Sequence, residues 1–422
     1  MQHKTLVSKH LFLFNSLTGR KELFRPRSGN SVVMFTCGPS IYKRQHLGNY
    51  RTFLYEDVLQ RYLQYRGYDV RRMINFTDVE DKAIAEIREQ RISLQELTRP
   101  VEEDFRTHAA ALKIRLPNEI PRSSTSVDST VRLIQTLLDK GYAYRHGQDV
   151  FFDPLQYDGF GRLFGLDMSR WPLETKRFSK DTYPGQRWNL GDFILWHGYT
   201  AEDGDVYWET ALGKGRPSWN VQDQGMIARD LGFSIDIHCG GMDNLYRHHD
   251  YILAVMEAAS GKPYARFWLH GEYVLKDGQK MSKSSGNVTF PEDVLTNGVD
   301  PAQLRLLFLL QHYRSPVDIT SEGLGAAGEK LSSLQNLAGA VVTPQGEVHQ
   351  DQSAAIKVLS DLRFEFEAAM NDDLNTGRAL DSLSLNLARL LTIKTQQGLG
   401  NRPAARIKNQ LERIDDVLGI LF

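Results

Sequence analysis

The sequence predicts an α/β protein with a parallel sheet, an inserted subdomain and a C-terminal α-helical bundle. Three observations predict this class: a strand–helix–strand pattern over residues 31–76, an irregular middle rich in aromatic residues and glycine, and leucine-rich helical periodicity after residue 343. At roughly 150 residues per domain, the 422 residues correspond to two or three domains.

The first expected strand is Ser31–Cys37, where β-branched and aromatic residues lead into a Gly-Pro pair. Apolar residues at helical spacing follow and stop at Gly67, a residue suited to a helix C-terminus. Val70–Phe76 is expected to be the second, parallel strand. Because ligands of such sheets bind at the carboxyl ends of the strands, residues 37–49 are expected to form a binding loop.

Residues 117–217 are less regular: a helical stretch near residues 131–138 precedes a part rich in aromatic residues and glycine, from Tyr142 to Trp208. We expect this region to be an insertion within the sheet domain. The α/β pattern resumes with a strand at Ile235–His238 and a helix from about His248 to Ser260. Beyond a linker near Thr343, leucine and isoleucine recur at steps of three and four in three stretches. These stretches predict three amphipathic helices packed as a bundle.

The composition indicates a cytoplasmic enzyme. With 51 basic and 52 acidic residues, the net charge of −1 offers no global attraction to nucleic-acid phosphates. The two cysteines cannot form a disulfide framework. No apolar run reaches the length of a membrane span, and the N-terminus lacks the features of a cleavable signal.

The segment Gln45–Asn49 reads Gln-His-Leu-Gly-Asn and directly precedes a predicted helix. Gly48 allows a flat ligand to approach the backbone, His46 can donate to a phosphate, and a helix N-terminus favours anions. By itself this short motif has an equally good structural explanation.

A second motif, Lys280–Ser284, reads Lys-Met-Ser-Lys-Ser on a loop rich in glycine and hydroxyl groups. Lys280 and Lys283 suit a clamp on a polyphosphate. A solvated basic loop would explain either lysine alone, but it does not explain this pentapeptide together with the His46 motif.

Together these motifs resemble the class I aminoacyl-tRNA synthetases and, within them, the cysteinyl-tRNA synthetases. The resemblance covers nearly the whole chain and includes the segments 75–82, 216–219, 240–243 and 370–376. The cysteine ligase of mycothiol biosynthesis, which joins cysteine to an amino sugar without tRNA, shares these motifs and is similar in extent.

The resemblance implies a Rossmann-like class I catalytic sheet and a defined division of the chain. The implied parts are the first catalytic half, 1–116; a connective subdomain, 117–217; the second catalytic half, 218–290; a stem-contact region, 291–342; and a helical bundle, 343–422.

The implied activity is an ATP-dependent ligase reaction in which an amino-acid carboxylate attacks ATP and gives aminoacyl-AMP. Catalysis then consists of positioning and charge stabilisation, with Mg²⁺ accompanying ATP. The implied ATP contacts are His46 and Asn49 on the phosphates, Gly48 under the adenine, Asp243 on the ribose, and Lys280 and Lys283 on the leaving pyrophosphate.

The amino-acid pocket departs from the family pattern. The residues implied to line it are Cys37, Thr77, Trp219, Asp223 and His248. Family members bind zinc through Cys, Cys, His and Glu, with the substrate thiolate as a further ligand. Cys37 and His248 match the first and third ligands, but Asp223 and Ile252 replace the second and fourth.

These replacements leave open whether zinc is bound by Cys37, Asp223 and His248, with Cys239 as a substitute donor. The alternative is that Cys37 is a small buried residue and His248 a hydrogen-bonded pocket histidine. Asp223 would then favour a hydroxyl or cationic substrate side chain, and cysteine is not expected to be the preferred amino acid.

The chain ends where the family's helical bundle ends, so an anticodon-binding extension is expected to be absent and tRNA binding weak. The leading hypothesis is therefore transfer of the acyl group to an unknown non-tRNA acceptor, a small amine or a carrier. One alternative is a truncated cysteine–tRNA ligase that charges tRNA. Another is a non-catalytic binding or regulatory paralogue, which the retained ATP motifs disfavour.

Overall fold

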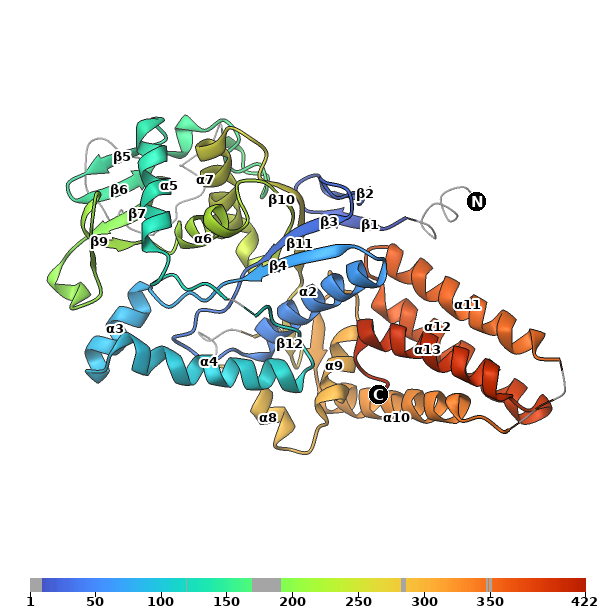
Figure 1. Cartoon of the computed structure of the whole chain (residues 1–422). Helices are drawn as coiled ribbons and strands as arrows, with labels where there is room; N and C mark the ends of the chain where they lie inside the picture. Colours follow the sequence, from blue (N-terminus) through green and yellow to red (C-terminus); the bar gives the residue numbers. More distant parts are fainter. Residues whose placement is uncertain (1–9, 119, 169–190, 282–285, 347, 349–350) are drawn as a thin grey trace.

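The structure is a computed structural model that describes residues 10–118, 120–168, 191–281, 286–346, 348 and 351–422. Its centre is a parallel four-stranded sheet with the order β11-β10-β3-β4, which confirms the predicted class (Figure 1). The strands are β3 (Ser31–Thr36), β4 (Asp69–Ile74), β10 (Ile235–Gly241) and β11 (Ala265–Gly271).

Helix α2 (Leu47–Tyr65) connects β3 to β4 and packs on one face of this sheet. It ends before Gly67, whose φ of 87° only glycine adopts readily, as the sequence predicts. Along the sheet, β4 lies on one side of β3 and β10 on the other. The carboxyl ends of β3 and β10 therefore flank the switch point at which sheets of this kind bind ligands.

The other face of the sheet is covered by α6 (Gln222–Asp230) and α7 (Asp250–Ser260), as Figure 1 shows. Side chains alternate between the two faces. Cys37, directly after β3, belongs to the apolar cluster with α6 and α7, whereas Met34 and Cys239 belong to the cluster on the α2 side.

The region between β4 and β10 includes a second, antiparallel sheet with the order β5-β6-β7-β9-β8. It is preceded by α3 (Asp81–Gln90), α4 (Leu94–Ala111) and α5 (Val127–Asp139). Its strands are β5 (Ala143–His146), β6 (Asp149–Phe152), β7 (Phe193–Gly198), β8 (Trp208–Thr210) and β9 (Gly213–Pro217). The Phe193 ring stacks on Tyr251 of α7 at 3.8 Å between centroids, which ties this sheet to the parallel-sheet domain.

A small sheet follows β11 and carries the start of the lysine-rich motif. It has the order β13-β12-β14 and leads into short helices. These elements are β12 (Val274–Lys276), β13 (Gln279–Lys280), α8 (Pro291–Leu295), α9 (Pro301–Leu310) and β14 (Val317–Ile319). An N-terminal hairpin, β1 (Phe12–Asn15) with β2 (Arg20–Leu23), packs beside β11.

The C-terminal part is an elongated helical bundle (Figure 1). The three predicted helices are confirmed as α11 (Ser353–Asn371), α12 (Thr376–Gln397) and α13 (Asn401–Leu418). They are joined by α10 (Ser321–Val342), which packs against α12 and α13. The sequence did not predict α10 as a bundle helix because glycine and alanine hold many of its positions and weaken the apolar periodicity.

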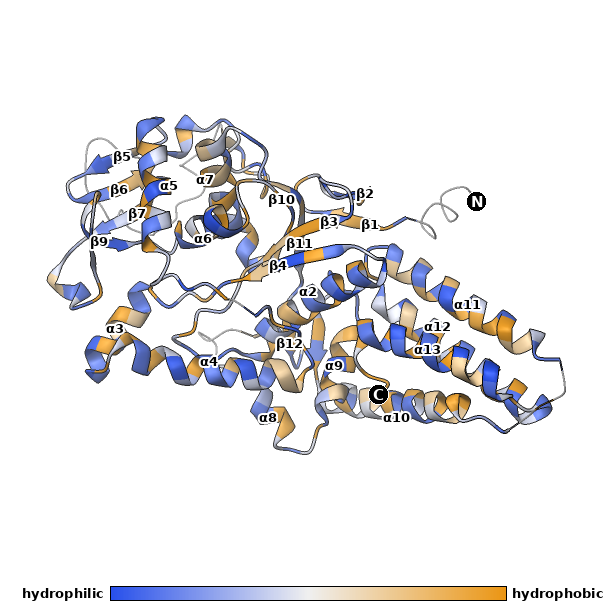
Figure 2. Ribbon diagram, viewed as in Figure 1, coloured by the Kyte–Doolittle hydropathy of each residue, from blue (hydrophilic) through white to orange (hydrophobic). Residues whose placement is uncertain are grey.

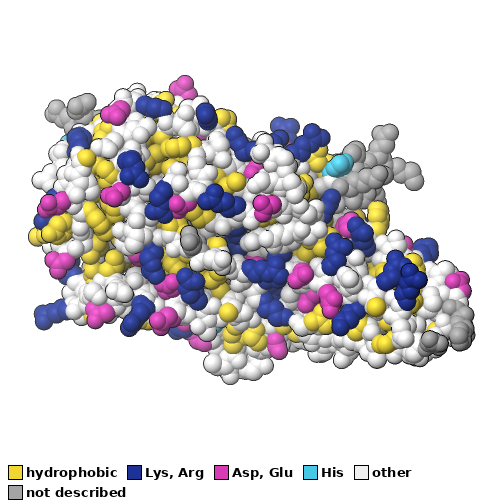
Figure 3. Space-filling model, in the orientation of Figure 1, with side chains coloured by type: hydrophobic (Ala, Val, Ile, Leu, Met, Phe, Trp, Pro, Cys, Tyr) yellow, Lys and Arg dark blue, Asp and Glu magenta, His cyan; other side chains and the backbone are white. Residues whose placement is uncertain are grey.

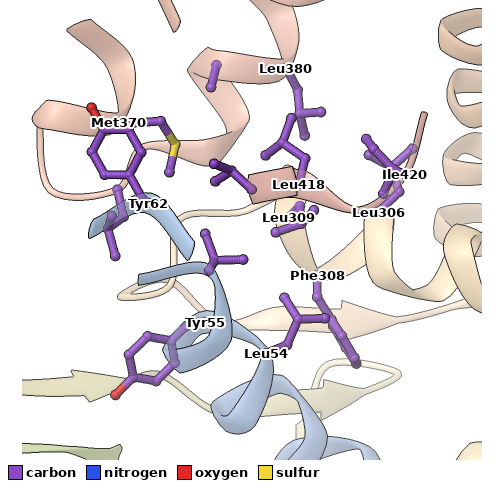
Figure 4. Packing of buried hydrophobic residues seen from close by; sticks show 14 of the residues in the cluster. Leu54, Tyr55, Tyr62, Leu306, Phe308, Leu309, Met370, Leu380, Leu418 and Ile420 are labelled. Atoms are coloured by element: carbon purple, nitrogen blue, oxygen red, sulfur yellow. The ribbon is translucent and has the colours of Figure 1, made fainter. Parts of the chain in front are cut away.

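One apolar core joins the bundle to the sheet domain. Leu54 of α2, Phe308 of α9 and Leu418 of α13 belong to the same buried cluster (Figure 4). The fully buried Arg305 donates to the Leu418 carbonyl at 2.6 Å and pairs with Asp57 of α2 at 3.1 Å. Figure 2 shows the matching pattern, with a largely apolar β3 in the central sheet and alternating polar and apolar residues along the bundle helices.

The surface carries charges of both signs. Lysine and arginine lie among aspartate and glutamate over the face drawn in Figure 3, in keeping with the net charge of −1. Within the described residues, no helix combines the length and hydrophobicity that crossing a bilayer requires.

Candidate active site

The candidate site lies where the carboxyl ends of β3, β4 and β10 meet. The Gly38 amide, after β3, donates to Oδ1 of Asn75, after β4, at 2.9 Å. A Cβ atom at position 38 would lie 1.6 Å from the Asn75 carbonyl oxygen. Only glycine permits this approach, so the β3 loop can turn across the sheet edge and open the site.

Two adjoining cavities occupy this edge. One, of about 240 Å³, is lined by His46 and Asn49, and the other, of about 380 Å³, by Thr77 and Trp219. The residues that line both are Cys37, Gly38, Ser40, Tyr42, Asp243 and Asn244. The pair of cavities can hold a ligand with two chemically different ends.

His46 caps α2 and faces the first cavity. Its Nδ1 accepts from the Gly48 amide at 3.1 Å, and its own amide donates to Oδ1 of Asn49 at 3.1 Å. With Nδ1 as an acceptor, the neutral ring carries its proton on Nε2. An imidazole donor and the N-terminus of a long helix together suit an anion.

Gly48 and Asp243 take different positions. Gly48 is not among the lining residues, and a Cβ there would lie 2.8 Å from the His46 ring, so this glycine makes room for the imidazole. Asp243 is exposed in a 3₁₀ turn after β10 and presents its carboxylate where the two cavities join.

Lys280 ends β13 and stacks on the Tyr273 ring, with Nζ 3.4 Å from the ring centroid. It does not line either cavity, and Lys283 lies outside the described residues. The two motifs are nevertheless neighbours, because the Leu47 amide donates to the Thr289 carbonyl at 2.9 Å.

The second cavity has an aromatic wall. The Trp219 ring lies over His248, with 5.6 Å between centroids. Just before His248, Arg247 adopts φ 73° and ψ −69°, a strained γ-turn geometry. This turn points the adjacent histidines in different directions, His248 toward the cavity and His249 toward the sheet.

The predicted metal donors lie close together. Oδ2 of Asp223 is 3.1 Å from Nε2 of His248 and 3.9 Å from Sγ of Cys37. Ligand atoms of these three residues all lie within 4.8 Å of one another, and sulfur, oxygen and nitrogen donors suit zinc. Ile252 is fully buried among apolar side chains and offers no ligand. The site thus fits a three-ligand ion.

Two further histidines contact Cys37, and the sequence analysis did not identify them. Nε2 of His249 lies 3.1 Å and Nε2 of His238 lies 3.6 Å from Sγ. Nδ1 of His238 contacts the Tyr264 hydroxyl at 2.9 Å, and Nδ1 of His249 contacts His270 at 2.7 Å. These residues form a second donor set that shares Cys37 with the first.

Burial keeps these groups uncharged. Desolvation raises the pKa of Cys37 well above its usual value, and the nearby Asp223 adds to the shift. Desolvation also lowers the pKa of His238 and His249 well below the usual value, and that of His270 to about 3. Neutral imidazoles have the protonation state that metal ligation requires.

The proposal of Cys239 as a substitute donor is wrong. Its side chain lies on the α2 face of the sheet, whereas Cys37 lies on the other face. Cys239 pairs with Thr36, the residue before Cys37, and successive residues of a strand point to opposite faces. The same alternation places His238 on the Cys37 face. Strand alternation around Cys239 is the sequence signal that could have identified His238.

Comparisons with known proteins agree with this geometry. The profile of the family described as "tRNA synthetases class I (C) catalytic domain" matches residues 23–329, and that of the "DALR domain" matches residues 365–422. A protein named cysteine–tRNA ligase from Chlamydia felis is 36% identical, with 100% of this chain and 88% of that protein covered. One from Chlamydia pneumoniae is 36% identical, with coverages of 97% and 86%.

Among solved structures, Mycobacterium tuberculosis methionyl-tRNA synthetase in complex with methionyl-adenylate superimposes with a TM-score of 0.64. It is 14% identical, and the superposition covers 93% of this chain and 90% of that one. This similarity shows a shared fold.

Proposed function

This chain belongs to the cysteinyl-tRNA synthetase family of ATP-dependent ligases, and from that premise we propose that it joins cysteine to tRNA through a cysteinyl-adenylate. The observation that carries the proposal is the pair of adjoining cavities at the sheet edge. One cavity has an anion-binding helix terminus, the other an aromatic wall with polar groups, and Asp243 lines both. An aminoacyl-adenylate has the matching two ends.

The choice of tRNA as acceptor rests on the relatives. Proteins named cysteine–tRNA ligase match the whole chain or nearly all of it at 36% identity. The hypothesis of a small amine or carrier as acceptor has no such support. The non-catalytic hypothesis is disfavoured by the intact His46 and Asn49 arrangement.

In the first step, a carboxylate oxygen of the amino acid attacks the α-phosphorus of ATP. The new P–O bond forms as the bond to the leaving pyrophosphate breaks, and no protein group becomes covalently attached. The N-terminus of α2, Nε2–H of His46 and the amide NH₂ of Asn49 hold the phosphates during this exchange. Mg²⁺ neutralises polyphosphate charge when it is bound.

The remaining ATP contacts follow the same assignment. Asp243 accepts from the ribose hydroxyls, and Gly48 acts indirectly, by making room for the His46 imidazole. Lys280 and Lys283 stabilise the negative charge on pyrophosphate as it leaves. Their loop lies near the His46 loop through the Leu47–Thr289 hydrogen bond.

In the second step, a terminal ribose hydroxyl of tRNA attacks the acyl carbonyl, and AMP leaves. The amino acid stays in the second cavity against Trp219 and Thr77, with Asp223 and His248 beside its side chain. Zinc, which the family implies, would be held by Cys37 with Asp223 and His248 or with the deeper histidines. When bound, it would supply affinity for a thiolate.

The division of the chain supports these two steps. We assign residues 1–116 and 218–290 to the catalytic halves and 117–217 to the connective subdomain. Residues 291–342 would contact the tRNA stem, and 343–422 form the bundle, against which α10 from the preceding region also packs.

A charging assay tests the acceptor. The purified chain is incubated with labelled cysteine, ATP and total tRNA, and alkali-labile label retained on tRNA is counted. We expect ATP-dependent charging that the His46→Asn variant abolishes. Adenylate formation without charging would reject tRNA as acceptor and restore the small-acceptor hypothesis.

A further inference from the structure

The Cys37 thiol belongs to two groups of candidate metal ligands, and a single ion cannot be bound by both groups at once. The outer set adds Asp223 and His248, which line the amino-acid cavity. The inner set adds His238 and His249, which are fully buried beneath it. We propose that this chain binds a zinc-type divalent ion at the inner set, through Sγ of Cys37 and Nε2 of His238 and His249.

The sulfur–nitrogen distances at the inner set are close to those around a tetrahedral ion. Zinc–sulfur and zinc–nitrogen bonds at tetrahedral angles place sulfur and nitrogen about 3.6 Å apart. Sγ of Cys37 lies 3.6 Å from Nε2 of His238 and 3.1 Å from Nε2 of His249. All three donor atoms lie within 4.8 Å of one another.

Both inner imidazoles are held from behind in the way metal ligands are. When Nδ1 of His238 donates to the Tyr264 hydroxyl, the lone pair of Nε2 faces Cys37. When Nδ1 of His249 donates to Nε2 of His270, the lone pair of Nε2 of His249 likewise faces Cys37. Nδ1 of His270 in turn contacts the Ser16 hydroxyl at 2.7 Å. Such outer partners fix the tautomer and the ring orientation of a ligating histidine.

The outer set lacks this support. Nδ1 of His248 is buried and has no hydrogen-bond partner among the described residues. Its Nε2 is engaged by Oδ2 of Asp223, whose Oδ1 accepts from Nδ2 of Asn75 at 2.8 Å. Asp223 and His248 thus satisfy each other, and Ile252 provides no fourth donor.

With both Nδ1 atoms donating, two Nε2 lone pairs face Cys37, and one thiol proton can satisfy only one of them. Cys37 has a single S–H, yet two Nε2 atoms face its sulfur within the apolar cluster between the sheet and α7. A cation bound by the thiolate would satisfy all three atoms at once, and its binding releases the thiol proton to solvent. The ion would then link the end of β3, the middle of β10 and the start of α7 below the amino-acid pocket.

This site leaves Asp223 and His248 as the polar groups that face the substrate side chain. The inference concerns the same pocket as the proposed function but does not depend on the amino acid or the acceptor. Its test therefore measures bound metal, and a failed charging assay would leave that result unaffected.

The experiment is a cobalt titration of the full-length, metal-stripped chain, monitored through the thiolate-to-cobalt charge-transfer absorption. The zinc stoichiometry is measured separately by mass spectrometry. Four variants discriminate the sets: His238→Gln and His249→Gln at the inner set, and Asp223→Asn and His248→Gln at the outer one. Cys37→Ser removes a donor common to both and does not discriminate. Thermal unfolding reports whether each variant folds.

We expect one ion per chain, at least a 100-fold loss of cobalt affinity in each folded inner variant, and less than a threefold change in the outer variants. Tyr264→Phe removes only the hydroxyl behind His238 and should weaken binding about 10- to 100-fold. It keeps the test decisive if a buried histidine variant does not fold. Absence of cobalt binding by the unmodified chain, or loss confined to the outer variants with Tyr264→Phe unchanged, would overturn the inner site.

Discussion

Nε2 of His249 lies 3.1 Å from Sγ of Cys37, although 212 positions separate the two residues. Cys37 follows β3, and His249 is the N-cap residue of α7. The contact joins the two parts of the catalytic sheet domain across the inserted antiparallel sheet. The floor of the second cavity therefore exists only when both parts are assembled.

His46→Asn should lower the rate of adenylate formation by a factor on the order of 10² or more, because it removes a donor to the phosphates. Asparagine is as good a helix N-cap as any residue, so α2 should keep its start. Pyrophosphate exchange and the melting temperature are measured together. An unchanged exchange rate in the folded variant would refute the assigned role.

Lys283→Ala should also lower adenylate formation by a factor on the order of 10² or more, because positive charge at the leaving pyrophosphate is lost. Lys280→Ala should act in the same direction. Lys276→Ala, on the neighbouring strand β12, serves as the matched control and should leave the rate within about twofold. Equal rates in all three variants would show that the loop plays no part in the chemistry.

Trp219→Ala should raise KM for the amino acid about tenfold or more and leave KM for ATP unchanged. The indole forms a wall of the second cavity and is absent from the first. A tenfold rise corresponds to about 1.4 kcal/mol of lost binding energy, a size typical of one aromatic contact. Trp208→Ala, a half-buried tryptophan outside both cavities, is the control. A rise in KM for ATP alone would contradict the pocket assignment.

The buried carboxyl of Glu56 makes the free energy of unfolding depend on pH, and a single substitution can test this contribution. Burial raises the pKa of this carboxyl to about 8, despite Arg72 at 3.4 Å. Between the unfolded pKa near 4.5 and the folded value, the native state holds a proton that the unfolded chain releases. The contribution of Glu56 to stability is therefore present at low pH and is lost as pH rises through about 8.

Glu56→Gln removes this titration. The fall in the free energy of unfolding from pH 5.5 to pH 8.0 should be smaller in the variant by about 3 kcal/mol. Urea unfolding at both pH values measures it. Parallel pH profiles for the two proteins would show that Glu56 is ionised in the folded state.

The sequence predicted the parts of the site that local patterns encode. His46 and Gly48 stand between a β-branched strand and an amphipathic helix, so their place at a strand's carboxyl end followed from the βαβ pattern. Cys37 followed in the same way.

Apolar Ile235 and Ile237 alternate with polar Asp236 and His238 in β10, so this alternation could have assigned His238 to one face of the sheet. It could not show the contact with Cys37, because that contact depends on the pairing of β10 with β3. The contact of Asn75 with Asp223 joins residues 148 positions apart and depends on how the insertion folds. Helix α10 was not predicted for a different reason. Its buried residues Ala327, Leu331, Leu334, Ala338 and Val341 recur at helical spacing, but two of them are alanines, which mark an apolar face only weakly.

ATP–pyrophosphate exchange with each of the twenty amino acids tests the central claim most directly. It reports adenylate formation and amino-acid choice without requiring an acceptor. The family membership and the two-cavity site predict exchange with cysteine well above that with every other amino acid. Absence of exchange with all twenty, or a clear preference for a hydroxyl or cationic side chain that Asp223 would favour, would contradict the proposal that this chain activates cysteine.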